Sequence, residues 1–397
     1  MKNTMIVFAG MALLWWACGQ KPAEQTTGLP ELLKRPQVIG PEGEMASLLD
    51  LYDDLAGKIR SNPADVTSRL TLIELFLQEA RISGEHGYYY PAALQMVDQV
   101  LAMPLKPAEQ YRALLDKASI LLSQHQFAEA RRVGEQALAL NPNEAGIYGV
   151  LIDANVELGQ YDKAVEMADK MVAIRPDIRS YSRISYLREI HGQVDGAIEA
   201  MKMAVAAGYP GMEQTEWARL TLGDLYRKYG HLDSAVLQYK TALSVRPNYP
   251  FAVAALANAE AETGNMEAAE TQMAKACALI PEVGFFVDRA RWAKQQGRTA
   301  EAAAMTKDIL AMLADDVASG HRMGLEYVEV YLDLLDNPDE ALKYALEEYA
   351  QRPENIDVNL ALARIYRKKG DDEMARKHLT AAMRTHSKNP EMLALAQ

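Results

Sequence analysis

Cysteine is nearly absent from this sequence. Only Cys18 and Cys277 occur among its 397 residues, so a disulfide framework cannot be what stabilises the fold. Cys277 directly follows an alanine on a segment with helical spacing, and we expect it to be a small, buried thiol. The protein therefore has to be held together by packing.

The motifs that carry chemistry are missing as well. The sequence has no His-Glu-x-x-His segment, no paired Cys-x-x-Cys motif, no Gly-x-Ser-x-Gly elbow and no phosphate-binding Gly-Lys-Ser/Thr loop. Three of the seven histidines, His125, His191 and His231, fall in or beside predicted turns, where we expect them to be solvated and far from any common centre. We therefore expect no enzyme, no cofactor and no metal site.

Positive charge is in deficit. The chain has 42 Lys and Arg against 54 Asp and Glu, which gives a net charge of −12. Nucleic-acid binding generally needs a basic face, so nucleic acid is not an expected partner. The acidic excess is otherwise typical of a soluble surface.

Long apolar runs are lacking except at the N-terminus. Met5 to Trp16 is apolar but too short to span a bilayer comfortably, and it follows the basic Lys2, as in a signal peptide. The stretch that ends at Cys18 resembles a bacterial lipoprotein signal, although Trp15 stands where that family prefers leucine. The resemblance implies a signal peptide over residues 1–17 and a lipid on Cys18. An ordinary signal or an uncleaved anchor are the alternatives.

The residues after Cys18 are rich in Gly, Pro, Gln, Thr and charge. This composition predicts a flexible linker over residues 18–45, between the lipid and the fold. Gly19, rather than aspartate, follows the cysteine, which in families with the usual sorting rule resembles an outer-membrane address. We thus expect an anchored protein of the bacterial cell envelope, more specifically of the outer membrane.

What the sequence does contain is a repeat. Between Leu222 and Pro281 the second half repeats the first at a period of 34, so that Gly230 matches Gly264 and Ala235 matches Ala269. A fixed period of this size indicates a solenoid. Within one unit, apolar residues at helical spacing predict two helices, with the glycine between them and a proline after the second.

A small residue recurs where the two helices of each unit would cross. Alanine allows a close approach in an interior that is too densely packed to accept extra methylenes. The matching alanines are Ala130, Ala164, Ala197, Ala235, Ala269, Ala302, Ala341 and Ala375. Two longer intervals require insertions, at Ala207 to Thr215 and Asp315 to Met323.

This pattern resembles the tetratricopeptide repeat family. The matching residues in one unit are Leu222, Gly223, Tyr226, Ala235, Ala242 and Pro247. The resemblance implies an all-α fold over residues 46–397, a right-handed superhelical solenoid of about eight helical hairpins. The repeats start near residues 111, 145, 178, 216, 250, 283, 322 and 356, and a degenerate one with Ala93 precedes them. Glu348 replaces a second small residue, which predicts loose packing in the seventh hairpin.

One stretch fits the repeat poorly. The segment Arg81 to Pro91, with three consecutive tyrosines, occupies the place of a tight turn. Two interpretations remain open. One or two tyrosines pack on the first hairpin, or the segment is a long binding loop at the rim.

In this family the first helix of each hairpin lines the concave side, which implies a set of partner-binding candidates. These are Arg179, Arg183, Tyr186, Trp217, Asp224, Arg227, Asn258, Arg291 and Lys294. Some family members clamp a peptide carboxylate with basic residues at such places, and Arg179 and Arg183 match the basic pair of that clamp. The complete clamp is absent, because Leu115, Ser119 and Val150 stand where it has Lys and Asn.

An acidic protein that gathers arginine on its inner surface predicts an acidic or carboxylate-ended partner. We therefore expect a lipid-anchored envelope scaffold that binds protein or peptide segments and aids assembly or stability of another envelope component. A glycan or small-ligand binding protein is the alternative, since exposed aromatics stack on sugars. The alternative to partner binding by the arginines is that they form ion pairs with nearby acids of this chain, such as Asp224 or Glu189.

Overall fold

The computed structural model describes residues 28–35 and 38–397. Contacts divide the chain into two units, Met1–Glu31 and Leu32–Gln397. The predicted signal peptide, Cys18 and the first part of the predicted linker lie outside the described residues, and residues 28–31 contain neither helix nor strand.

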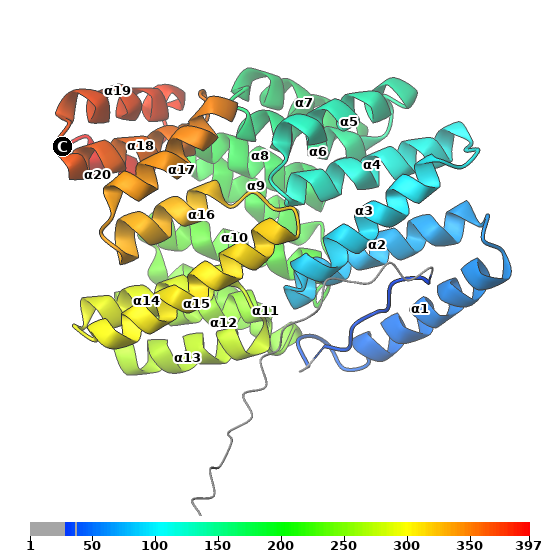
Figure 1. Ribbon diagram of the computed structural model, residues 1–397, viewed down its shortest axis with the longest axis horizontal. Helices are drawn as coiled ribbons and strands as arrows, with labels where there is room; N and C mark the ends of the chain where they lie inside the picture. The colour runs from blue at the N-terminus through cyan, green and yellow to red at the C-terminus, as the bar shows by residue number, and fades with distance from the viewer. Residues whose placement is uncertain (1–27, 36–37) are drawn as a thin grey trace, which may run out of the picture. The chain divides into compact units, whose positions relative to one another are not determined.

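The second unit is all-helical over its described residues (Figure 1). A single helix, α1 (Glu44–Ser61), precedes a hairpin of α2 (Val66–Ser83) and α3 (His86–Leu101). Eight further hairpins follow: α4 (Pro107–Ser123) with α5 (Phe127–Leu140), α6 (Ala145–Glu157) with α7 (Tyr161–Ile174), α8 (Ile178–Ile190) with α9 (Val194–Ala206), α10 (Glu213–Lys228) with α11 (Leu232–Val245), α12 (Pro250–Glu262) with α13 (Met266–Leu279), α14 (Val283–Gln295) with α15 (Thr299–Ala318), α16 (Gly324–Glu329) with α17 (Pro338–Gln351), and α18 (Ile356–Lys369) with α19 (Asp372–Ala382). The short α20 (Pro390–Leu395) is the last helix. None of the helices in residues 28–35 and 38–397 combines the length and apolarity needed to cross a membrane.

The predicted repeat is confirmed. All eight alanines of the repeat are buried, six of them completely. The facing helix also carries a small residue where space is tightest: a Cβ on Gly223 would overlap the ring of Tyr239 one helix away. Gly230 and Gly264 both have φ of 84° and follow the first helices of their hairpins, where a helix end favours glycine.

The seventh hairpin departs from the pattern, but not by loose packing. Glu348 is 8% exposed and lies over Gly324, where a Cβ would collide with it. Its carboxylate accepts from Arg352 Nε at 2.7 Å, so the larger side chain is accommodated by a glycine and a buried ion pair. The irregularity falls instead on the first helix, where α16 continues as a π-helical turn, η1 (Val330–Leu334).

The binding-loop interpretation of Arg81 to Pro91 is wrong. Helix α2 runs to Ser83, Gly84 turns with φ of 73°, and α3 begins at His86. Tyr89 and Tyr90 are buried, and the ring of Tyr89 packs on Phe76 of α2, as the packing interpretation held. The tight turn of the repeat is therefore retained here.

The predicted flexible linker also needs correction where it is described. Helix α1 begins at Glu44, two residues before the predicted boundary, and the non-helical residues 32–35 and 38–43, which we call the strap, pack on the solenoid. Leu32 and Ile39 of the strap are 7% and 1% exposed. These two apolar residues override the polar composition around them, because burying an apolar side chain contributes roughly 1.5–3 kcal/mol.

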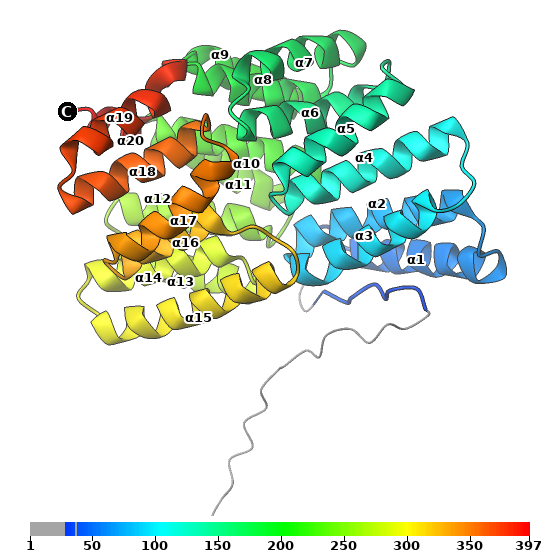
Figure 2. The same cartoon turned by 45° about the horizontal axis from the view of Figure 1, so that its top comes forward.

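The stack of hairpins closes on itself. Turns within early hairpins, at residues 124–126, 157–161 and 192, contact the connections between late hairpins at 319–322, 352–356 and 384–388. We call these contacts the seam. Arg352 Nη1 lies 2.5 Å from the Glu157 carboxylate, and the partners are 195 residues apart. Figures 1 and 2 both show the red C-terminal hairpin returning to the green helices.

Most hydrogen bonds of the seam join residues that are 194 to 198 apart, and the bond from Arg384 to the Gly159 carbonyl spans 225. Gln124 Nε2 donates to the carbonyl of Ser319 at 3.2 Å, and the Ile356 N–H donates to the hydroxyl of Tyr161 at 2.9 Å, both across 195 residues. His125, predicted as a solvated turn residue, donates from Nδ1 to the Arg322 carbonyl at 2.8 Å. The similar spacing of most of these bonds follows from the repeat itself, because each hairpin adds nearly the same rotation.

Candidate partner-binding surface

The first helices of the hairpins form the inner layer. Helices α2, α4, α6, α8, α10 and α12 contact one another in series, whereas α7, α13 and α19 lie on the outside in Figure 1. In a curved stack, the side on which consecutive helices approach each other is the concave side. The predicted candidates on α8, α10 and α12 therefore belong to the inner layer, and Arg291 and Lys294 lie on α14, the first helix of the next hairpin.

Arg183 is committed to the packing of α6 against α8. Its guanidinium lies over Gly149 and forms a two-point ion pair with Asp153, at 2.9 Å from Nε and 2.6 Å from Nη2. Nη1 also donates to the carbonyl of Arg179 at 3.1 Å. A guanidinium with this many intramolecular hydrogen bonds has few N–H donors left to bind a ligand.

The candidates of the fourth and fifth hairpins are paired in the same way. Arg227 donates to Glu262 at 2.6 Å, and Asn258 donates to Asp288 at 3.1 Å. Asp224 accepts from the hydroxyl of Tyr239 at 2.7 Å. Burial raises the pKa of Asp224, although this hydrogen bond opposes it. These side chains link neighbouring helices.

Arg291 and Lys294 serve the π-helical turn. Arg291 pairs with Glu329 and with Asp333, the latter at 2.9 Å. Lys294 Nζ donates to the carbonyls of Asp333 and Leu334 at 2.8 and 3.0 Å. A π-turn interrupts the regular hydrogen-bond ladder, and the lysine satisfies carbonyls at its end.

A second lysine completes this arrangement. Lys368 Nζ donates to the Leu332 carbonyl at 2.9 Å, and both lysines contact Asp336 at 2.6 Å. Hydrogen bonds from Lys294 and Lys368 lower the pKa of Asp336 to about 2. The alternative of intramolecular pairing thus holds for Arg183, Arg227, Arg291 and Lys294. Their partners are acids other than Asp224 and Glu189.

Arg179 is different. Its backbone N–H donates to Asp177, but its guanidinium has no hydrogen bond or ion pair among the described residues. Burial, and then the charges of Arg183, Arg175 and Arg81, lower the pKa of Arg179. Arg183, Arg175 and Arg81 each pair with an acid, so the guanidinium of Arg179 is the one in this group that has no ion pair among the described residues.

Two exposed aromatic side chains lie on the same helices. Tyr186 follows Arg179 by seven residues on one face of α8 and is 38% exposed, and Trp217 on α10 is 46% exposed. One turn before Trp217, Glu213 pairs with Arg81 at 3.6 Å. Arg179, Tyr186 and Trp217 are the predicted candidates that remain available to a partner.

The surroundings of Tyr186 differ from those of Arg179. Burial, and then the carboxylates of Asp357 and Glu157, raise the pKa of Tyr186 well above its ordinary value. Burial raises the pKa of Glu157 to about 7, with Arg352 opposing it. The Glu157 carboxyl is ion-paired with Arg352 across the seam, so it presents no free negative charge to a ligand near Tyr186.

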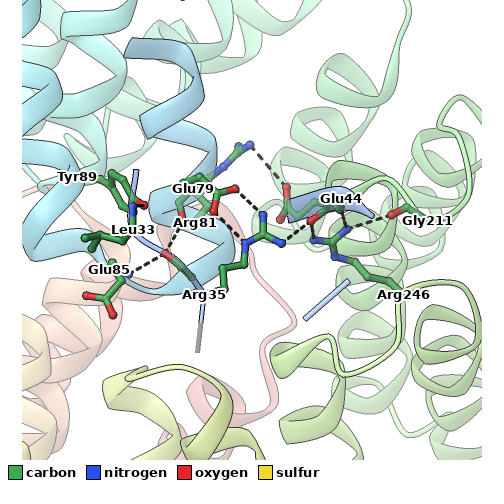
Figure 3. A network of polar contacts seen from close by, with 11 residues as sticks. Leu33, Arg35, Glu44, Glu79, Arg81, Glu85, Tyr89, Gly211 and Arg246 are labelled. Carbon is green, nitrogen blue, oxygen red and sulfur yellow. Dashed lines mark hydrogen bonds and ion pairs between the residues drawn. The ribbon is translucent and has the colours of Figure 1, made fainter. Parts of the chain in front are cut away.

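Sequence reasoning missed a second polar centre, around the strap. Arg35 and Glu44 form an alternating series of ion pairs with Glu79 of α2 and Arg246 of the α11–α12 connection (Figure 3). The only sequence signal was the group of apolar residues at Leu32, Leu33, Val38 and Ile39 within a polar stretch. Among the described residues, no group of three or more His, Cys, Asp or Glu is arranged to hold a metal ion.

Comparisons with known proteins identify the repeat. Family models described as tetratricopeptide repeat match residues 121–188, residues 90–145 with 220–282, and residues 356–385. None of the curated proteins matches the sequence.

Several solved structures are similar to this chain. The tetratricopeptide repeat protein TTC0263 of Thermus thermophilus is 24% identical over 48% of this chain and 98% of its own, with a TM-score of 0.41. The human IFIT1 dimer with PPP-AAAA is 14% identical over 89% and 96%, with a TM-score of 0.47. YrrB, described as having an unusual peptide-binding site, is 21% identical over 44% and 88%, with a TM-score of 0.31.

Proposed function

We propose that this chain, which carries tetratricopeptide repeats along a closed superhelix, is a scaffold that holds a carboxylate-ended peptide segment on its inner layer. The observation that carries the proposal is the guanidinium of Arg179, which forms no hydrogen bond or ion pair with any described residue, whereas Arg183, Arg81 and Arg175 each pair with an acid. A planar guanidinium binds a carboxylate through two parallel hydrogen bonds. Tyr186 on the same face of α8 and Trp217 on α10 supply exposed apolar area on these first helices.

Charge removal at Arg179 tests this site. Arg179→Ala should weaken retention of a peptide library with free C-terminal carboxylates by about tenfold, since hydrogen bonds to charged groups contribute roughly 1.5–3 kcal/mol. An amidated library should bind wild type and variant equally. Raising the salt concentration should reduce the difference in retention of the free-carboxylate library between wild type and Arg179→Ala, because screening weakens exposed charge pairs.

Lys240→Ala, which removes an exposed charge from the outer helix α11, is the matched control and should leave retention unchanged. If wild type and Arg179→Ala retain the free-carboxylate library equally well, with the same salt dependence, Arg179 is not part of a carboxylate-binding site. The exposure of Trp217 and Tyr186 supports the alternative of a glycan or small-ligand binding protein. That alternative would be favoured if wild type retained oligosaccharides and Trp217→Ala did not.

We further propose that the scaffold is lipid-anchored through Cys18 at the bacterial cell envelope, with the outer membrane as its address, and that it aids assembly or stability of another envelope component without catalysing a reaction. The apolar run before Cys18, the cysteine itself and Gly19 support the anchor. One acyl chain holds a protein weakly and several hold it firmly, at about 0.8 kcal/mol per buried CH₂.

The anchor has a direct test. Cys18→Ala should release the protein from the membrane fraction or leave it unprocessed, whereas Cys277→Ala, which removes a thiol from the packed helix α13, should fractionate as wild type does. Processing and membrane association of Cys18→Ala that match wild type would exclude lipidation at this residue.

A further inference from the structure

The strap is held by the solenoid in the manner of a bound peptide. Among the described residues its backbone hydrogen bonds to other backbone groups reach only the start of α1, and none reaches a helix of the hairpins. The hairpins instead hold it with side chains: the Tyr89 hydroxyl accepts from the Leu33 N–H at 3.0 Å, and Asn248 Nδ2 donates to the Val38 carbonyl at 3.1 Å. Main-chain hydrogen bonds to an extended segment, with pockets for its side chains, are a recurring mode of peptide recognition.

Two strap side chains occupy specific places. Arg35, 4% exposed, forms a two-point ion pair with the fully buried Glu79, at 2.9 Å from Nε and 2.5 Å from Nη2. Ile39, 1% exposed, belongs to an apolar cluster with Ile82 of α2 and Val253 of α12. Charge recognition at one position and an apolar pocket four residues later define a preference for sequence.

The residue after Ile39 is also selected. A Cβ on Gly40 would lie 3.0 Å from Nη2 of Arg246, whose guanidinium is completely buried. Arg246 is fixed by Glu44 at 2.7 and 2.9 Å and by the carbonyl of Gly211 at 3.2 Å (Figure 3). A side chain at this position would require the buried Arg246–Glu44 ion pair to shift by a few tenths of an ångström, so glycine fits best.

We infer that the surface formed by Glu79, Ile82, Tyr89, Arg246, Asn248 and Val253, which we call the strap seat, is a binding site for an extended peptide with arginine four residues before an Ile-Gly pair. The strap occupies it in cis. An external segment with the same chemistry has to displace the strap, so the strap acts as a built-in competitor. This inference is independent of the carboxylate site at Arg179.

A peptide supplied in trans tests the inference. The probe is a fluorescent synthetic peptide with the sequence of residues 31–43, added to the full chain and to the Arg35→Ala/Ile39→Ala variant, in which the strap is weakened and the strap seat is unchanged. Because a tethered competitor acts at a concentration on the order of millimolar, the variant should bind the peptide at least about tenfold more tightly than wild type. The peptide should also raise the Tm of the variant and not that of wild type, since a ligand of the folded state stabilises it.

The controls separate recognition from general stickiness. A probe peptide with alanine in place of its arginine and isoleucine should bind neither protein, and Glu79→Gln in the variant background should abolish binding of the intact probe. If the double variant does not fold, Ile39→Ala alone replaces it. The inference would be overturned if a folded variant failed to bind the probe, or if wild type and variant bound it with equal affinity. The strap would then be a structural segment only.

Discussion

Gly159→Ala should be among the most destabilising single-methyl substitutions in this protein. Gly159 has φ of 70°, where an alanine costs roughly 1–2 kcal/mol. A Cβ there would also overlap the backbone of Glu354 across the seam, which has to move at a further cost of roughly 1–3 kcal/mol. We expect a total loss of about 2–5 kcal/mol in the free energy of unfolding, measured by chemical denaturation.

The repeat supplies a matched control. Gly230 occupies the same turn position in the fourth hairpin with φ of 84°, but no atom lies within 4 Å of a Cβ built there. Gly230→Ala should therefore cost only the backbone strain, roughly 1–2 kcal/mol. Hydrogen exchange at Ile356, whose amide donates to Tyr161 across the seam, should accelerate in Gly159→Ala alone. Equal losses in the two variants would mean that the seam is open in solution.

The helices and their order can be predicted from sequence because their determinants are local. An alanine, a glycine and a proline at fixed spacing describe one hairpin, and Ala235 reports on contacts within that hairpin and the next. The two longer intervals correspond to the α9–α10 connection and to the extended α15 with the connection that follows it. The loop interpretation of Arg81 to Pro91 was wrong because consecutive tyrosines do not by themselves indicate a loop. The turn between the two helices lies at Gly84.

The seam could not be predicted in the same way. Glu157 and Arg352 are ordinary polar residues of two different repeats, and nothing within either repeat indicates that they meet. Their contact depends on the rotation accumulated over the hairpins between them, so a small change in the angle per hairpin would separate them. The strap was missed for a related reason, since Ile39 packs on Val253 of a repeat that is distant in sequence.

The position of the candidate side chains could be predicted, but their pairing could not. The candidates lie on first helices, as the repeat geometry predicts, yet Arg183 and Arg291 pair with Asp153 and Asp333 from neighbouring hairpins. The sequence spacing places an arginine on a helix face without saying which acid of the next helix reaches it. The isolated guanidinium of Arg179 is visible only when those pairs are assigned.

Glu44→Gln should be the most destabilising isosteric substitution of a charged residue. The Glu44 carboxylate lies between Arg35 and the fully buried Arg246. The amide keeps the shape but leaves Arg246 without a carboxylate, and breaking a buried ion pair from one side costs roughly 3–5 kcal/mol. Because the Glu44 side chain is itself 22% exposed, we expect a loss near the lower limit, about 3 kcal/mol at pH 7, measured by denaturant unfolding.

The effect should depend on pH with a definite sign. Burial alone would raise the pKa of Glu44, but hydrogen bonds from Arg246 and Arg35 outweigh it and lower the pKa below its ordinary value of 4.5. A carboxylate with a lowered pKa contributes stability above its unfolded-state pKa and loses it as the pH falls through the folded-state value. The difference between wild type and Glu44→Gln should therefore be constant from pH 7 to about 5 and shrink below 4.5. Glu166→Gln, at an exposed pair with Lys170, should behave as wild type at every pH. A difference for Glu44→Gln that persists unchanged at the acid limit would show that the negative charge of Glu44 is not what stabilises its contact with Arg246.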